Sequence, residues 1–202
     1  MAKTVEFIFD FGSPNAYLAY YGLQPVLERT GAELVITPCL LGGIFKSSGN
    51  QPPMMNFAGV AGKNEMFMRE IERYCDRHNL SKFRMNPNFP VNTLMMMRAA
   101  VAYSRDNDLR PYIEAGIKCM WEDGRKMDDP EVFVEAFNDA GLDGQVLLEA
   151  TQDPEVKAQL MANTQGAVDR GAFGIPAFMV GDEQFFGKDH IEELEWWLLN
   201  RC

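Results

Sequence analysis

The stretch FDFGSPNAYLAY, residues 9–20, puts Ser-Pro-Asn at the point where an apolar segment passes into a helical one. Before it, aromatic and β-branched residues over residues 4–11 predict a strand. After it, the apolar spacing over residues 14–30 predicts a helix that Gly31 ends. Residues 33–39 (ELVITPC) predict a second strand. The chain therefore begins with a β-α-β unit whose strands we expect to be parallel.

The C-terminal end carries a second strand-rich pattern. Residues 173–180 (FGIPAFMV) predict a strand, residues 184–186 a returning strand after a Gly-Asp turn, and residues 189–199 a closing amphipathic helix. From about residue 63 to residue 171 the periodicity is helical, with helices expected over 65–79, 92–107, 109–124, 129–141 and 153–170. The sequence thus predicts an α/β frame split by a helical block.

Local signals mark two helix starts inside the helical block and a loop before it. Asp129-Pro130 and Asp153-Pro154 combine an N-cap residue with a proline at the first helical position, so each predicts a helix start. Residues 42–62 are rich in Gly, Pro, Ser and Asn, which predicts a loop at the junction of frame and block. Loops at such junctions often bind ligands.

Composition excludes several classes of function. The formal net charge of -10 argues against nucleic acid or an anionic membrane as the main partner. No apolar run approaches the roughly 20 residues that cross a bilayer, and the N-terminus shows no leader pattern, so we expect a cytoplasmic protein. The four cysteines form neither CxxC nor a metal-ligand cluster, which predicts structural thiols and no metal site.

Ser13 stands at the strand-to-helix junction and admits three interpretations. A nucleophilic serine needs a base, yet the chain has two histidines, His78 and His190, and no GxSxG motif, which disfavours a serine hydrolase. Alternatively, Ser13 caps the helix and does nothing else. The third possibility is that its hydroxyl donates to a bound anion beside the free N–H groups of the helix N-terminus.

Two further motifs have both a structural and a functional interpretation. Pro176 in Gly-Ile-Pro is a strand-start proline, or its peptide bond is cis and the backbone of Ile175 pairs with a peptide-like ligand. Residues 186–190 (FGKDH) precede the last helix. Either Asp189 caps that helix, or glycine, Lys188 and Asp189 together bind an α-amino and α-carboxylate group.

Taken together, FIFDFGSPNAYLA and GAFGIPAFMVGDEQFFGKDHIEEL resemble the 2-hydroxychromene-2-carboxylate isomerases and the related kappa-class glutathione transferases over essentially the whole chain. The resemblance implies a DsbA-like thioredoxin fold, with a thioredoxin-like domain at residues 1–43 and 164–202. An all-helical domain would be inserted at residues 44–163. Disulfide oxidoreductases of this fold carry CxxC at the junction, where this chain has SPNA, residues 13–16.

The resemblance also implies a site for glutathione as the cofactor. Ser13 would hydrogen-bond the glutathione thiol and favour its thiolate, since a hydroxyl donor and a helix N-terminus both lower a thiol pKa. Ile175, next to Pro176, would pair with the cysteinyl part of the tripeptide. Four residues would hold its γ-glutamyl end: Phe186, Gly187, Lys188 and Asp189. His190 departs from the arginine expected after that aspartate, which weakens any role that needs a permanent cation there.

For the second substrate, a small aromatic carboxylate, the resemblance implicates Lys46 and Asn56, and Asn92 is a further lining residue. Lys46 is equally interpretable as a solvated surface lysine. An apolar pocket could draw on several residues that otherwise fill the core: Met54, Met55, Phe89, Met95, Met96 and Met97.

The implied reaction is the isomerisation of 2-hydroxychromene-2-carboxylate to trans-o-hydroxybenzylidenepyruvate by thiolate addition, ring opening, bond rotation and elimination. Two alternatives remain: a kappa-like transferase that keeps the adduct as its product, and a non-catalytic thioredoxin-like binding protein. The missing CxxC disfavours a dithiol oxidoreductase. Relatives commonly dimerise, so we expect a homodimer.

Overall fold

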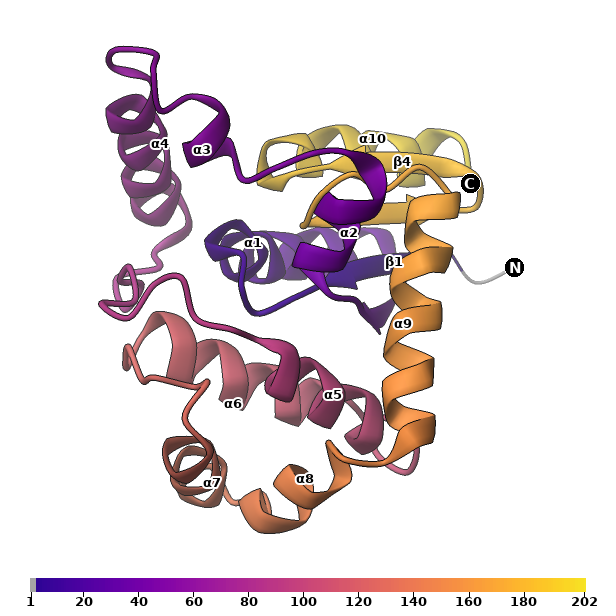
Figure 1. Cartoon of the computed structure of the whole chain (residues 1–202). Coiled ribbons are helices and arrows are strands. Elements are labelled where there is room, and N and C mark those ends of the chain that lie inside the picture. Colours follow the sequence, from indigo (N-terminus) through magenta and orange to yellow (C-terminus); the bar gives the residue numbers. More distant parts are fainter. Residues whose placement is uncertain (1–2) are drawn as a thin grey trace.

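A four-stranded sheet formed by the two ends of the chain carries the fold (Figure 1). The computed structural model describes residues 3–202. The strands lie in the order β2-β1-β3-β4 and comprise β1 (Thr4–Phe9), β2 (Glu33–Pro38), β3 (Ala177–Val180) and β4 (Glu183–Phe186). β1 is parallel to β2 and antiparallel to β3, and β4 is antiparallel to β3.

β1 is one of the two inner strands, and it has buried side chains on both faces. Val5, Phe7, Ile8 and Phe9 are fully buried. The Phe7 ring lies 4.9 Å from that of Phe178 on β3, between ring centroids. A strand covered on both faces reads as a continuous apolar run, which explains why this segment is so rich in aromatic residues.

Four helices pack on and around the sheet. α1 (Pro14–Thr30) lies beside α10 (Ile191–Asn200), and α9 (Pro154–Asp169) packs along β2 and against α2 (Leu41–Ser48) (Figure 1). α1 ends where the sequence predicts, because Gly31 adopts the left-handed conformation with φ +66° and donates its N–H to the carbonyl of Leu27.

The remaining helices form the block between the strands: α3 (Pro53–Asn56), α4 (Lys63–His78), α5 (Leu94–Tyr103), α6 (Arg110–Trp121), α7 (Pro130–Asp139) and α8 (Gly144–Ala150). α3 and α4 form an arm at the upper left of Figure 1, and α7 and α8 lie farthest from the sheet. Inside the block, the Tyr112 ring stacks on Phe137 at 4.6 Å between centroids. Within residues 3–202, no helix combines the length and the apolarity that crossing a bilayer requires.

The predicted α/β class and the N-caps of α7 and α9 are confirmed. Asp129 accepts hydrogen bonds from the backbone N–H groups of Glu131 and Val132, and Asp153 accepts one from Glu155. The predicted loop over residues 42–62 is wrong in part, because it contains α2 and α3. Gly43, interpreted as a loop signal, packs against α9: a Cβ there would lie 2.9 Å from Thr164 Cγ2.

Other boundaries also differ from the predictions. β1 ends at Phe9 rather than at residue 11, β2 ends at Pro38, and α8 was not predicted. The strand predicted over residues 173–180 begins only at Ala177, after a loop in which the Ile175–Pro176 peptide bond is cis. A 3₁₀ turn, Lys188–His190, precedes α10. Asp189 does not cap it, because neither this turn nor α10 has a side-chain cap.

The strands come from residues 4–38 and 177–186. Of the ten α-helices in the described chain, eight (α2 to α9) lie between β2 and β3. The division at residues 43/44 and 163/164 stays a prediction. The second of these boundaries falls inside α9, where the side-chain amide of Asn163 donates to the Pro38 carbonyl at 3.0 Å. α9 is therefore a continuous link between the helical block and the sheet.

Candidate functional site

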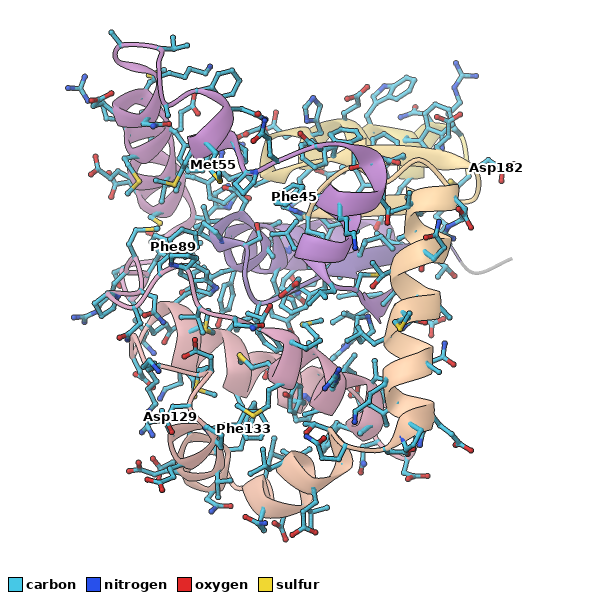
Figure 2. The ribbon with its side chains drawn as sticks, in the orientation of Figure 1. Phe45, Met55, Phe89, Asp129, Phe133 and Asp182 are labelled. Atoms are coloured by element: carbon cyan, nitrogen blue, oxygen red, sulfur yellow. The ribbon has the colours of Figure 1, made fainter. Side chains whose placement is uncertain are left out.

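A cleft of about 740 Å³ lies where the β1–α1 junction, the loop before β3, the 3₁₀ turn and the α3–α4 arm come together. This volume falls in the range of small-molecule sites, about 300–1,000 Å³. Phe45 from α2 and Phe89 from the loop before α5 both contribute to its lining (Figure 2). The cleft thus draws on segments from both ends of the chain and from its middle.

Ser13 lies in this cleft at the head of α1 and is 5% exposed. It occupies the N-cap position with extended backbone, but its side chain makes no capping hydrogen bond. The interpretation of Ser13 as a side-chain cap is therefore wrong. Its hydroxyl instead donates to the carbonyl of Ile175 at 2.9 Å. This bond joins the two motifs that the sequence places at opposite ends of the chain.

No histidine serves Ser13 as a base in the described chain. The hydroxyl is hydrogen-bonded to a carbonyl, and the Nδ1 of His190, the histidine that lines the cleft, lies 2.6 Å from the Phe186 carbonyl oxygen. His78 is stacked on Tyr74 of the arm. The geometry agrees with a serine that donates a hydrogen bond rather than one that attacks a substrate.

α6 holds the short loop that joins the end of β1 to Ser13. The indole Nε1 of Trp121 donates to the Phe11 carbonyl at 3.0 Å, and both residues are fully buried. Gly116 lies against the Phe11 ring so closely that a Cβ would be 2.4 Å from it. The helical block therefore positions the junction directly.

In the 3₁₀ turn, which also lines the cleft, Lys188 and Asp189 form an ion pair. The Nζ of Lys188 lies 2.6 and 2.8 Å from the two carboxylate oxygens, and the Lys188 side chain is 4% exposed against 68% for Asp189. The same Nζ lies 5.3 Å from the centroid of the Tyr74 ring. Phe186, Gly187, Ile175 and Pro176 complete this part of the lining.

The three residues expected to contact the second substrate lie in different places. Asn92 lines the cleft, and its side-chain oxygen accepts from the Leu94 N–H at 3.0 Å. Lys46 is exposed in the last turn of α2 and is not among the lining residues. Asn56 also lies outside the lining, and its side-chain amide donates to the Gln51 carbonyl at 3.2 Å. Besides Lys188, the lysine that lines the cleft is Lys63, the first residue of α4.

The apolar wall of the cleft uses only some of the residues that the sequence suggested. Met54 and Phe89 line it, whereas Met96 and Met97 are fully buried core residues. Met55 is 65% exposed and lies outside the lining. Three aromatic residues that were not singled out also contribute: Phe45, Phe57 and Phe67.

Sequence reasoning missed several polar cleft residues, among them Asp10, Asn15 and Lys63. Asp10 and Asn15 lie inside the stretch that decides the fold, on either side of Ser13, and their polarity beside an apolar strand was the available signal. The side-chain oxygen of Asn15 is buried and has no hydrogen-bond partner among residues 3–202. A buried polar atom without a partner is costly, so it marks a place where a ligand can contribute.

None of the four cysteines lines the cleft, and all four are unpaired. Burial raises the pKa of the Cys39 thiol to about 12, so Cys39 is held as the neutral thiol. Within residues 3–202 no group of three or more His, Cys, Asp or Glu side chains is arranged to hold a metal ion. Thiol chemistry in this cleft would therefore use a sulfur that arrives with a ligand.

Comparisons with known proteins agree with this geometry. The family model for the DSBA-like thioredoxin domain matches residues 4–198. A 2-hydroxychromene-2-carboxylate isomerase of Sphingobium xenophagum is 29% identical over 202 residues, 99% of this chain and 100% of the relative. Glutathione S-transferase kappa 1 of Homo sapiens is 27% identical over 96% of this chain and 90% of its own length.

The fold comparison points the same way. The solved structure of a 2-hydroxychromene-2-carboxylate isomerase superposes with a TM-score of 0.84 at 21% identity, over 98% of this chain and 96% of that one. The relatives matched in sequence are thus isomerases and glutathione transferases that share the length of this chain.

Proposed function

The chain belongs to the DSBA-like thioredoxin domain family, and from that premise we propose that it is a glutathione-dependent isomerase of 2-hydroxychromene-2-carboxylate. The observation that carries the proposal is the Ser13 hydroxyl. It is buried at the head of α1, 2.9 Å from the Ile175 carbonyl, in a cleft that no cysteine lines.

The residues of the cleft fit glutathione. The Lys188–Asp189 pair offers a cation for the γ-glutamyl carboxylate and an acid for its ammonium group. Ile175 offers its backbone to the cysteinyl part. The unpartnered oxygen of Asn15 gives a ligand N–H an acceptor beside Ser13. The tripeptide would thus extend from the 3₁₀ turn to the front of α1.

When bound, glutathione supplies a thiolate that adds to and leaves a conjugated substrate, so that one bond is free to rotate in between. The chain's own contribution is to favour that anion. The Ser13 hydroxyl would turn from the Ile175 carbonyl toward the sulfur, and the N-terminus of α1 would add its partial positive charge. A hydrogen-bond donor that points at a developing negative charge in a partly buried site is usually the largest single contribution to catalysis.

The arm side of the cleft would hold the aromatic carboxylate. The rings of Phe45, Phe57 and Phe89 offer apolar contact to a planar substrate. Lys63 lies with its Nζ 5.2 Å from the Phe57 ring centroid, and no carboxylate of residues 3–202 lies within 4.0 Å of it. We therefore propose Lys63, together with Asn92, for the substrate carboxylate in place of Lys46 and Asn56.

A kappa-like glutathione transferase is the second candidate, favoured by the similarity to the human kappa enzyme. The two activities differ in the fate of glutathione. The purified protein is incubated with glutathione and either 2-hydroxychromene-2-carboxylate or a model aryl halide. An isomerase converts the chromene with no net loss of glutathione. Stoichiometric loss with the aryl halide, and no conversion of the chromene, would replace the isomerase by the transferase.

A binding protein without catalytic activity is separated from both enzymes by calorimetry and the assay above. Binding of glutathione without either reaction supports the binding protein, and absence of binding removes both enzyme proposals. Robust reduction of insulin would instead indicate a dithiol oxidoreductase. We further propose that the protein acts in the cytoplasm and that it is a homodimer. Sedimentation at several protein concentrations tests the dimeric state.

A further inference from the structure

Asp10 is a buried acid beneath the cleft that the proposed chemistry does not use. It follows β1 directly and is 1% exposed. Its Oδ1 accepts from the Gly12 N–H at 2.8 Å and from the Thr93 hydroxyl at 2.6 Å, and its Oδ2 accepts from the Leu41 N–H at 2.7 Å. One carboxyl group thus has three donors from three separate segments.

These three donors belong to three walls of the cleft. Gly12 precedes Ser13 in the turn, Leu41 is the first residue of α2, and Thr93 is the N-cap residue of α5. All three line the cleft. Fixing their relative positions sets where the Ser13 hydroxyl lies with respect to α2, which carries Phe45, and with respect to the loop that carries Asn92.

A carboxylate suits this junction better than a neutral side chain. It presents two acceptor oxygens, so both backbone N–H groups and the hydroxyl can be satisfied together, whereas the amide of asparagine has only one oxygen. The arrangement costs stability: no Lys, Arg or His of residues 3–202 lies within 4.0 Å of this carboxylate, and burial raises its pKa. A costly buried acid at the floor of a site points to a role in that site.

We propose that Asp10 is the positioning residue of the site, which holds the turn before Ser13, the start of α2 and the start of α5 in the arrangement that catalysis needs. The proposal rests on the proposed function for its catalytic readout. Asp10 itself does not touch the substrate. It acts through Ser13, because the orientation of the Ser13 hydroxyl depends on the conformation of the turn at Gly12.

The test compares Asp10→Asn with Asp182→Asn, which removes an exposed acid from the β3–β4 turn and so controls for net charge. Three quantities are measured: kcat and KM for the isomerase reaction, the pKa of the bound glutathione thiol from thiolate absorbance, and hydrogen exchange at the amides of Gly12 and Leu41. We expect Asp10→Asn to lower kcat by about 10-fold or more with a smaller change in KM, because small displacements of a catalytic donor are costly.

The bound thiol distinguishes positioning from charge. Removing a buried anion would by itself lower the thiol pKa, whereas misplacing the Ser13 donor raises it. A raised thiol pKa together with faster exchange at Gly12 and Leu41 supports the proposal. A lowered thiol pKa with normal or higher kcat overturns it, and so does a loss of stability with unchanged kcat per folded molecule.

A second pair of variants covers the case in which Asp10→Asn does not fold. Thr93→Val removes one donor to Asp10, and Thr93→Ser keeps the hydroxyl. We expect kcat to fall in the valine variant and to be restored largely by serine; equal values for the two contradict the proposal. If the wild-type protein does not bind glutathione, the proposed function fails, while exchange at the Gly12 amide in the same variants still tests the role of Asp10.

Discussion

Ser13 is the residue on which the proposed chemistry depends. We expect Ser13→Ala to keep the fold and much of the glutathione affinity but to lose turnover on the order of 10²-fold or more, because one donor to the thiolate is removed. The lost bond to the Ile175 carbonyl should cost about 1 kcal/mol of unfolding free energy. Steady-state kinetics and urea unfolding measure the two effects.

The matched control for this change is Ser48→Ala. The Ser48 hydroxyl donates to the Ile44 carbonyl at 2.8 Å on α2, outside the cleft. This variant should keep wild-type turnover. Near-normal turnover in Ser13→Ala would reduce Ser13 to a structural link between α1 and the loop before β3.

The buried carboxyl of Asp10 should make stability depend on pH. Burial raises its pKa above 3.8 in the folded protein, so the folded state holds this proton more tightly than the unfolded state does. The contribution of Asp10 is therefore fully present below pH 3.8 and is lost as the pH rises through the folded pKa.

Urea unfolding of the wild-type protein and of Asp10→Asn over about pH 4 to 7 measures this contribution. The unfolding free energy of the wild type relative to the variant should decline as pH rises. Asp182→Asn, whose side chain points to solvent in Figure 2, corrects for the change in net charge. A difference that grows with pH would show that the folded carboxyl is stabilised as the anion.

At the scale of elements, the position of the arm formed by α3 and α4 determines which lysine lines the substrate side of the cleft. In α4, Ile71 and Tyr74 are buried, and Phe67 and Met68 are partly buried against the core. The helix is therefore attached from its second turn onward, while Lys63 begins the more exposed first turn. Lys63→Met should raise KM for the aromatic carboxylate about 10-fold, the effect of losing about 1.4 kcal/mol of binding.

Lys46→Met is the comparison for this prediction, since Lys46 lies on α2 outside the cleft. Kinetics with the carboxylate substrate and binding of its methyl ester separate recognition of the charge from apolar contact. Neither Lys63→Met nor Lys46→Met should change the affinity for the methyl ester, which has no negative charge. A KM that rises with Lys46→Met and not with Lys63→Met would return the role to the residue that the sequence first suggested.

Part of the site could be predicted from the sequence and part could not. Ser13, Ile175 and Lys188 belong to motifs of neighbouring residues, and the structure brings them into one cleft. The sequence did not point to Lys63, because which lysine faces the cleft depends on how the arm folds back. Gly43 gave a loop signal although it is a packing residue, since a glycine needed for close approach looks like any other glycine.

At the scale of the whole molecule, glutathione should stabilise the native chain, because it binds across segments that separate on unfolding. At 100 times its Kd a ligand adds about 2.7 kcal/mol, which corresponds to a rise in Tm of roughly 5–10 °C for a chain of this size. Thermal unfolding with increasing glutathione measures this shift.

The control for this shift is the tripeptide with alanine in place of cysteine. It should stabilise the protein less than glutathione does, and the difference between the two should be smaller in Ser13→Ala. An equal difference in the wild type and in the variant would show that the hydroxyl does not recognise the sulfur.

The bond between Ser13 and Ile175 spans 162 positions of the chain. During synthesis, the N-terminal side of the site leaves the ribosome long before its counterpart, and one edge of β1 has no neighbour until the last strands emerge. An unpaired apolar edge invites association with other chains. A nascent or prematurely terminated polypeptide of this protein would therefore lack the site altogether and be prone to aggregate, so that cells gain the activity only from chains that extend through β4 and the 3₁₀ turn.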